Sequence, residues 1–377
     1  MNIAFISYPS LELSAGGERW LTEVSTRMSA SGYSVSILTS TYGENRHNSI
    51  LNRLCDASVE YCTYNPLMEG LSMPTVRSFS KIASFISHQD AIYFVHFGGG
   101  IELAVALSNL LTSTPTIVGF HSKFENRQGS SAMSHIYDSL FGPRGIRFMR
   151  KADAFHVINK SDRDFLLRIG LSPIFTVPNG VDTKFFTPTE KAESFTILYV
   201  GRLIATKGVR QLKRIWHDVA NQIIDLRLVI IGEGALEAEL RNDLSDDRVM
   251  FMGFVEDENV KREWMSKSHV LLFPSPSEAF GLVALEALSS GTPVMCWNIE
   301  PLNSLIKTGY NGFLSDDIND FSKHILDLSD MWKNDEASYF ELCKNARFSA
   351  VKCDWDSTIV PKLNDIFNNV VDSCKHR

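Results

Sequence analysis

The chain has 377 residues, of which 44% are hydrophobic and 21% are charged. This length and composition are typical of a soluble globular protein with two domains. The net charge is −7, and the acidic excess falls after residue 180, which disfavours broad nucleic-acid binding. Because the sequence contains no run of about 18 apolar residues, we expect no membrane-spanning helix.

The first residues of the chain and the pattern of its cysteines indicate the cellular compartment of the protein. Residues 2–7 form a short apolar run without the basic flank and long apolar core of a signal peptide. The six cysteines are scattered and include no C-x-x-C pair, a pattern typical of reduced thiols that pack as small hydrophobic side chains. We therefore expect a cytoplasmic protein.

Short apolar runs rich in Val, Ile and Phe alternate with helical patterns along the whole chain. The expected strands are 2–7, 34–39, 91–95, 115–119, 154–158, 174–177, 195–200, 226–231, 249–252, 270–273 and 293–297. The expected helices between them include 18–31, 76–87, 102–111 and 281–289. Several of the runs are unbroken rather than alternating, as in parallel strands that are buried on both faces. The alternation predicts doubly wound α/β domains.

The alternation pauses once, at the turn sequence 178–182 and the polar residues that follow it. We place a linker at 183–194, between an N-terminal domain at 1–182 and a C-terminal domain at 195–355. Ligands of open α/β sheets bind outside the carboxyl ends of the strands. Two Rossmann-like domains facing each other would therefore form a cleft with a donor side and an acceptor side.

A glycine-bounded loop follows the expected strand 195–200. It reads G-R-x4-K-G and contains Arg202 and Lys207. A guanidinium and an ammonium at the carboxyl edge of a sheet suit a diphosphate, the first as a bidentate fork and the second as a point charge. Taken alone, two solvated loop charges explain these residues equally well.

Two glutamates follow the expected strand 270–273. Glu278 lies on the loop after this strand, and Glu286 lies one turn into the next helix. The backbone N–H groups of Phe280, Gly281 and Leu282 would lie at the N-terminus of that helix, which favours phosphate. Glu286 could accept hydrogen bonds from ribose hydroxyls. Its neighbours in sequence are apolar, and a buried carboxylate would need a partner.

The expected strand 249–252 stops at a glycine, and the backbone of Gly253, Phe254 and Val255 could pair with the edge of a base. Together with the two motifs above, this arrangement resembles glycosyltransferase family 4, retaining enzymes of the GT-B fold. The most specific features are the E-x7-E pattern of Glu278 and Glu286 and the G-R-x4-K-G element. The resemblance covers nearly the whole chain.

The resemblance implies a role for each matched residue. Arg202 and Lys207 would bind the donor diphosphate, Glu286 the ribose, and Glu278 the sugar ring near its 3- and 4-hydroxyls. It also implies that no divalent metal is needed and that the nucleotide sugar is a co-substrate rather than a cofactor. In agreement, no Asp-x-Asp motif follows an expected strand.

The resemblance extends to the N-terminal domain. Gly16 and Gly17 belong to a glycine-rich loop at 14–18, and the family places such a loop over the donor phosphate and sugar. The alternative interpretation of residues 14–18 is an ordinary turn between a strand and a helix. His121 directly follows a strand, where family members often have a histidine that contacts the donor sugar near the reacting centre. The amphipathic C-terminal segment 356–377 would return to the N-terminal domain.

The expected function is transfer of a hexose from a UDP- or GDP-linked sugar to an acceptor hydroxyl with retention of configuration. Such a hexosyltransferase would serve glycan, lipopolysaccharide, capsule or glycolipid assembly. The alternatives are a nucleotide-sugar epimerase of GT-B fold and a non-catalytic nucleotide-sugar-binding subunit. A nicotinamide dehydrogenase is disfavoured because no G-x-G-x-x-G follows the first strand.

We expect the acceptor to be a saccharide or a lipid-linked molecule. Residues 141–151 help to distinguish the two, because they could contact a membrane. The segment contains Arg144, Arg147, Arg150 and Lys151 among apolar residues. A basic helix of this kind can lie on the anionic inner face of a membrane. A solvated helix with cations at its C-terminal end explains the segment at least as well.

Overall fold

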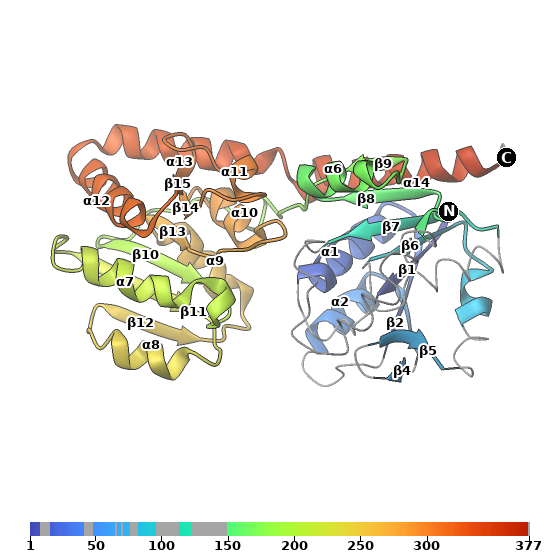
Figure 1. Cartoon of the computed structure of the whole chain (residues 1–377), viewed down its shortest axis with the longest axis horizontal. Helices are drawn as coiled ribbons and strands as arrows, with labels where there is room; N and C mark the ends of the chain where they lie inside the picture. The colour runs from blue at the N-terminus through green and yellow to red at the C-terminus, as the bar shows by residue number, and fades with distance from the viewer. Residues whose placement is uncertain are drawn as a thin grey trace. The chain divides into compact units, whose positions relative to one another are not determined.

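The computed structural model describes residues 1–7, 16–40, 48–64, 66–68, 71–75, 82–95, 113–121 and 149–375. The chain forms two compact units (Figure 1). The first unit consists of Met1–Asn179 and Trp355–Arg377, and the second consists of Gly180–Asp354. Residues 183–194, which the sequence assigns to a linker, therefore belong to the second unit in this division.

The first unit is built on a parallel sheet whose strand order, within the described residues, is β3-β2-β1-β6-β7-β8-β9. The strand order reverses between β1 and β6, as in a doubly wound sheet. The strands of this sheet are β1 (Asn2–Ser7), β2 (Ser34–Ser40), β3 (Glu60–Tyr64), β6 (Ala91–Phe94), β7 (Thr116–Phe120), β8 (Ala154–Val157) and β9 (Ile174–Thr176). A separate antiparallel pair is formed by β4 (Pro66–Met68) and β5 (Leu71–Pro74).

Helices from both ends of the chain complete the first unit. The helices are α1 (Gly16–Ala30), α2 (Asn48–Asp56), α6 (Lys160–Arg168), the one-turn η4 (Trp355–Ile359) and α14 (Val360–Lys375). Helix α14, red in Figure 1, buries Leu363, Phe367 and Val370 in the same core as β1 and α1. The rings of Phe5 and Phe367 meet with centroids 5.9 Å apart, so residues from the two chain ends share one apolar core.

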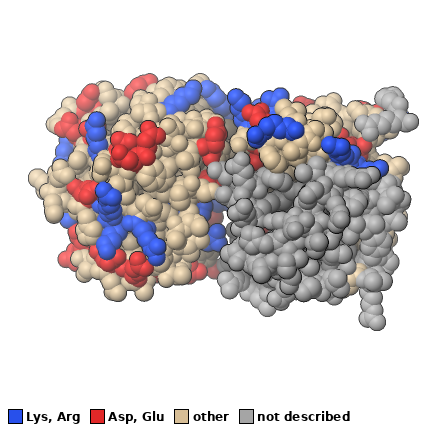
Figure 2. Space-filling model, viewed as in Figure 1, with Lys and Arg blue, Asp and Glu red and all other residues tan. Residues whose placement is uncertain are grey.

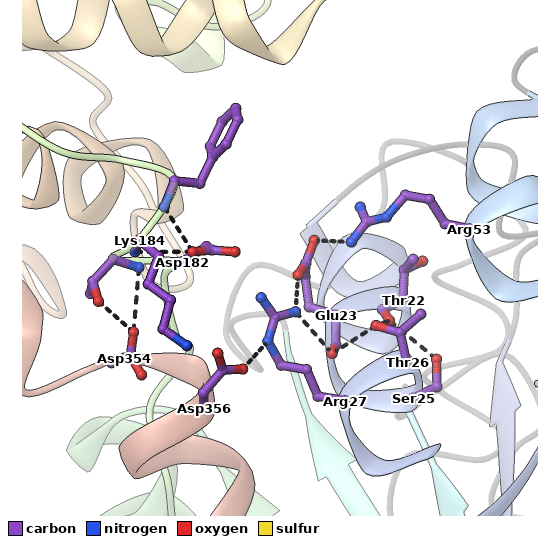
Figure 3. Close-up of polar contacts among 12 residues, drawn as sticks. Thr22, Glu23, Ser25, Thr26, Arg27, Arg53, Asp182, Lys184, Asp354 and Asp356 are labelled. Atoms are coloured by element: carbon purple, nitrogen blue, oxygen red, sulfur yellow. Dashed lines mark hydrogen bonds and ion pairs between the residues drawn. The ribbon is translucent and has the colours of Figure 1, made fainter. Parts of the chain in front are cut away.

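An ion network ties α1 to this C-terminal segment (Figure 3). Glu23 pairs with Arg27 one turn further along α1 and with Arg53 of α2 at 2.8 Å. Arg27 also donates to Asp356 at 2.8 Å. Burial opposes ionisation of Glu23, but the Arg53 and Arg27 guanidinium groups outweigh it and hold the pKa of the carboxyl below its usual value. The network therefore adds charge-assisted bonds to the apolar packing of α14.

The second unit contains another parallel sheet, with the order β12-β11-β10-β13-β14-β15 among the described residues. Its strands are β10 (Phe195–Val200), β11 (Leu226–Ile231), β12 (Val249–Gly253), β13 (Val270–Phe273), β14 (Val294–Trp297) and β15 (Gly312–Ser315). Its helices are η3 (Ala205–Lys207), α7 (Val209–Val219), α8 (Glu237–Asp243), α9 (Glu258–Lys267), α10 (Leu282–Ser289), α11 (Leu302–Leu305), α12 (Ile318–Asn334) and α13 (Glu336–Val351). The two doubly wound sheets confirm the predicted α/β class, and each predicted strand is present within two residues of its expected ends.

The segment at 183–194 is anchored to the second unit by polar contacts. Asp354 accepts from the hydroxyl of Thr183 at 2.5 Å (Figure 3). The ammonium of Lys191 donates to the carbonyl oxygens of Ser266 and Ser268 at 2.9 and 2.7 Å. It also donates to the hydroxyl of Thr292 at 2.8 Å. These bonds attach the segment that the sequence assigns to a linker to the second unit.

Three sequence predictions lie wholly or partly outside the described residues. The helix expected at 102–111 lies outside entirely, as do residues 76–81 of the helix expected at 76–87, whereas residues 82–86 are helical. Of the basic segment 141–151, the structure describes Met149, Arg150 and Lys151, and Met149 is buried. In the described part of the chain, no helix has the length and apolar character that a membrane span requires.

Candidate functional site

The loop after β10 contains Arg202 and Lys207, and the hydroxyl of a buried tyrosine is hydrogen-bonded to its backbone. Tyr199 lies on β10, and its hydroxyl is 3.2 Å from the carbonyl oxygens of both Arg202 and Lys207. Burial and the nearby carboxylate of Glu278 raise the pKa of Tyr199, so the phenol keeps the proton that it donates. The side chain of Leu203 on the same loop is fully buried. The loop is therefore held at both Arg202 and Lys207.

The loops after β10 and β13 touch through their backbones. Gly208 has a φ of +74°, and a Cβ atom on it would lie 2.0 Å from the carbonyl oxygen of Pro274. That carbonyl accepts from the indole N–H of Trp297 at 2.8 Å. The hydroxyl of Ser275 donates to the carbonyl oxygen of Thr206 at 3.1 Å. Only glycine permits this approach, and it brings the two sequence motifs into one site.

A charge pair spans these two loops. The Nζ atom of Lys207 lies 2.5 Å from Oε1 of Glu278, and the side chains are 26% and 10% exposed. A lysine ammonium has three donors, so Lys207 can keep Glu278 and still donate to a phosphate. Arg202 is exposed beside them. Its side chain forms no ion pair with the residues that the structure describes, so its guanidinium can bind an incoming anion.

Glu286 has the partner that its apolar neighbours require. It lies on α10 with 4% of its surface exposed, and Nζ of Lys261 on α9 is 3.3 Å from its carboxylate. Lys261 also pairs with Glu258 at 2.6 Å and lies 5.3 Å from the ring centroid of Phe186. Sequence reasoning missed Lys261, because in the chain it stands among other charged residues of an amphipathic helix.

The loop after β11 was also missed, and it joins the other two pieces of this sheet edge. The N–H of Gly232 donates to the carbonyl of Gly253 at 2.8 Å, and the N–H of Leu203 donates to the carbonyl of Glu233 at 2.8 Å. The loop therefore lies between the loop after β10 and the end of β12. The G-E-G sequence at 232–234, directly after an expected strand, is the signal that could have revealed it.

The remaining predicted residues of the second unit surround this edge. Phe254 is 54% exposed and follows Gly253, where β12 ends, and Val255 is half-buried. Helix α10 starts at Leu282 after Gly281, and no side chain caps it. Phe280 is buried immediately before it. Because no side chain caps this terminus, the first-turn amides could donate to an anionic group.

In the first unit, His121 directly follows β7 and is 9% exposed. Its ring packs against Trp20 of α1, with centroids 4.1 Å apart. Gly16 and Gly17 are the first residues of α1, whereas the sequence placed them in a loop. Glu18 in the first turn favours a helix that starts this early. Residues 14 and 15 of the same prediction lie outside the described part.

Charged side chains of both signs are interspersed on the second unit in Figure 2. This mixture differs from the one-sign surface of a nucleic-acid-binding protein. In the ranges that the structure describes, no group of three or more His, Cys, Asp or Glu side chains is placed to hold a metal ion.

Two family models together match most of the chain. The model described as Glycosyltransferase Family 4 matches residues 14–185, and the one described as Glycosyl transferases group 1 matches residues 194–331. The HepE protein of Anabaena, solved in complex with UDP and glucose, has a TM-score of 0.72 at 15% identity. The superposition covers 98% of this chain and 99% of that one.

Two curated relatives carry names that mention phosphatidylinositol. A GDP-mannose-dependent α-(1-6)-phosphatidylinositol dimannoside mannosyltransferase of Mycobacterium tuberculosis is 32% identical over 149 residues, or 37% of this chain and 39% of that protein. One subunit of the human phosphatidylinositol N-acetylglucosaminyltransferase is 26% identical over 311 residues, or 78% of this chain and 61% of that protein. The chain therefore spans less than two thirds of either relative.

The two doubly wound units and the similarity to HepE define a protein of the GT-B fold. The second sheet carries its paired charges at the carboxyl edge, where such folds bind ligands. The two family models show that the chain belongs to glycosyltransferase family 4.

Proposed function

We propose that this chain transfers a hexose from a UDP- or GDP-linked sugar to an acceptor hydroxyl with retention of configuration. The observation that carries the proposal is the ion pair of Lys207 and Glu278 at 2.5 Å. It joins the G-R-x4-K-G loop to the E-x7-E loop at the carboxyl edge of the second sheet. The backbone contact of Gly208 with Pro274 holds the same two loops together.

In this proposal the donor binds along the edge of the second sheet. Arg202 and Lys207 bind the diphosphate, with Arg202 as a bidentate donor. Glu286 accepts from the ribose, and the ammonium of Lys261 lies 3.3 Å from its buried carboxylate. Glu278 contacts the sugar ring. The base lies against the backbone of Gly253, Phe254 and Val255 at the end of β12, and the phosphates also accept from the amides of Phe280, Gly281 and Leu282.

The proposed reaction breaks the bond between the anomeric carbon and the β-phosphate oxygen. Negative charge develops on that oxygen, and Arg202 and Lys207 stabilise it at a partly buried edge. The acceptor oxygen bonds to the anomeric carbon from the same face, and its proton passes to the departing phosphate. His121 and the start of α1 at Gly16 and Gly17 are proposed to contact the donor. No step requires a metal.

The relatives suggest the range of substrates. One is named for GDP-mannose, and HepE was solved with UDP, so both nucleotides stay in the proposal. Two relatives are named for phosphatidylinositol substrates, which supports a lipid-linked acceptor. The chain would then work in the cytoplasm at the inner membrane face, and the basic segment 141–151 is the proposed point of contact.

The test combines turnover with matched variants. Removal of one such charge-stabilising donor lowers kcat by roughly 100- to 1,000-fold, so Arg202→Ala and Lys207→Ala should each lose most transfer from UDP- or GDP-hexoses to lipid acceptors. Lys344→Ala, which removes a 76% exposed lysine side chain on α13, is the control. Full turnover by a variant with both cations removed would refute the assignment. The anomeric configuration of the product, read by NMR, tests retention.

A further inference from the structure

A buried hydrogen-bonded chain crosses three neighbouring strands of the first sheet. Nε2 of His121 lies 3.0 Å from the hydroxyl of Tyr93 on β6. The same hydroxyl lies 2.5 Å from Nδ1 of His156 on β8. Nε2 of His156 lies 2.8 Å from the carbonyl oxygen of Val177. Tyr93 and His156 have 1% and 0% of their surface exposed, so water does not compete for these bonds.

The chemistry of the groups fixes the direction of each bond. The Val177 carbonyl can only accept, so Nε2 of His156 carries a proton. Burial, which outweighs this bond, lowers the pKa of His156 to about 4. The ring is therefore neutral at pH 7, and its Nδ1 has a lone pair. Tyr93, whose pKa is raised by burial, donates to that nitrogen. Its oxygen can then only accept from His121, which places a proton on Nε2 of His121.

Strand β7, which lies between Tyr93 on β6 and His156 on β8, leaves space for these hydrogen bonds at a glycine. Gly119 on β7 pairs in register with His156 on β8. A Cβ atom on Gly119 would lie 2.2 Å from the Tyr93 hydroxyl oxygen and 2.8 Å from Nε2 of His121. Any larger residue would displace the tyrosine hydroxyl. Trp20 packs parallel to the Tyr93 ring at 5.3 Å and also covers His121, so both rings are held on one side.

We propose that Tyr93 and His156 are positioning residues that fix His121 as the neutral tautomer with its proton on Nε2. Nδ1 of His121 is then a hydrogen-bond acceptor for a hydroxyl of the donor sugar. For the contact between His121 and the donor sugar, this inference rests on the proposed function. With the proton fixed on Nε2, the Nδ1 atom would be an acceptor throughout the reaction and would orient the sugar. If the proton exchanged freely between the two ring nitrogens, Nδ1 would be an acceptor only part of the time.

The tautomer can be measured without any substrate. Two-bond ¹H–¹⁵N correlation spectra of the full chain, labelled at histidine, distinguish a proton on Nε2 from one on Nδ1. The signal of His121 is identified by its loss in His121→Gln. We expect a single Nε2–H pattern in the wild type at pH 7 and a mixture in Tyr93→Phe. An Nδ1–H pattern in the wild type, or an unchanged pattern in a folded Tyr93→Phe variant, would overturn the inference.

Turnover gives a second readout with a matched control. Tyr93→Phe should lower kcat about tenfold while the Kd of UDP or GDP alone stays within twofold, because the tyrosine acts through His121 on the sugar and not on the nucleotide. Tyr339→Phe also removes a buried hydroxyl, which donates to the carbonyl of His269 at 3.0 Å in the second unit, and should retain kcat. If the wild type transfers no sugar, the proposed function fails and the tautomer measurement still decides this inference. If Tyr93→Phe matches the wild type in kcat, the positioning role is wrong.

Discussion

Replacement of Gly208 by alanine tests whether the two motif loops must touch. The new Cβ atom would lie 2.0 Å from the oxygen and 2.5 Å from the carbon of the Pro274 carbonyl. These are backbone atoms, and the oxygen is held by the Trp297 indole, so the loop itself must move. Gly309 is the matched control, because it has the same φ of +74° and nothing within 4 Å of its Cβ position.

Both variants force an alanine into a left-handed conformation, but only Gly208→Ala also creates a steric clash with the backbone. A left-handed alanine costs roughly 1–2 kcal/mol, and the stiffer unfolded chain offsets about half of that, so Gly309→Ala should lose about 1 kcal/mol. The overpacked backbone at Gly208 adds roughly 1–3 kcal/mol. At about 3 °C per kcal/mol for a unit of this size, Tm should fall by about 3 °C in Gly309→Ala and by about 9 °C in Gly208→Ala.

Calorimetric unfolding of the full chain measures the two shifts, and titration with UDP and GDP measures donor binding. Gly208→Ala should also bind the nucleotide more weakly, because the loop with Lys207 is pushed away from the loop with Glu278. Gly309→Ala should bind as the wild type does. Equal Tm shifts in the two variants would show that the contact with Pro274 does not constrain Gly208.

Two further predictions concern buried charge. Lys261→Met should cost about 3 kcal/mol of unfolding free energy and weaken nucleotide binding, because Glu286 loses its cation. The exposed Lys267→Met on the same helix should change neither quantity. If Lys261→Met binds the nucleotide with the Kd of the wild type, Glu286 has a purely structural role. The folded-state pKa of His156, about 4, lies below its unfolded value near 6.5, so its contribution is complete above pH 6.5 and is lost as the pH falls toward 4. Denaturant unfolding across that range should show a loss of about 3 kcal/mol in the wild type, and a slope that is unchanged in His156→Gln would contradict it.

The strands of the fold could be predicted because most are buried on both faces. Their unbroken apolar runs identify them without knowledge of neighbours. The two missed strands of the large sheets, β3 (Glu60–Tyr64) and β15 (Gly312–Ser315), lie at the sheet edges. An edge strand packs less and contains polar residues or glycine, so its run is broken. The linker at 183–194 was drawn from composition, which does not reveal that Lys191 reaches buried acceptors.

The candidate site was partly predictable for a similar reason. Residues that follow parallel strands meet at one sheet edge, so the nearness of Arg202, Lys207 and Glu278 follows from the element order. Lys261 could not be found in this way, because it lies inside a helix and reaches its partner across a packing interface. The bonds of the Tyr93 hydroxyl with His121 and His156 depend on sheet register, which the sequence does not specify.

The position of α14 in the core of the first unit has a consequence for how the chain acquires its structure. During synthesis, residues 1–179 leave the ribosome long before Phe367 and Val370 are made, so the N-terminal core stays open while the segment Gly180–Asp354 is translated. Domains generally fold as units while the chain emerges. The second unit can therefore be complete before the first, because Asp356, the ion-pair partner of Arg27, is translated after the whole of the second unit.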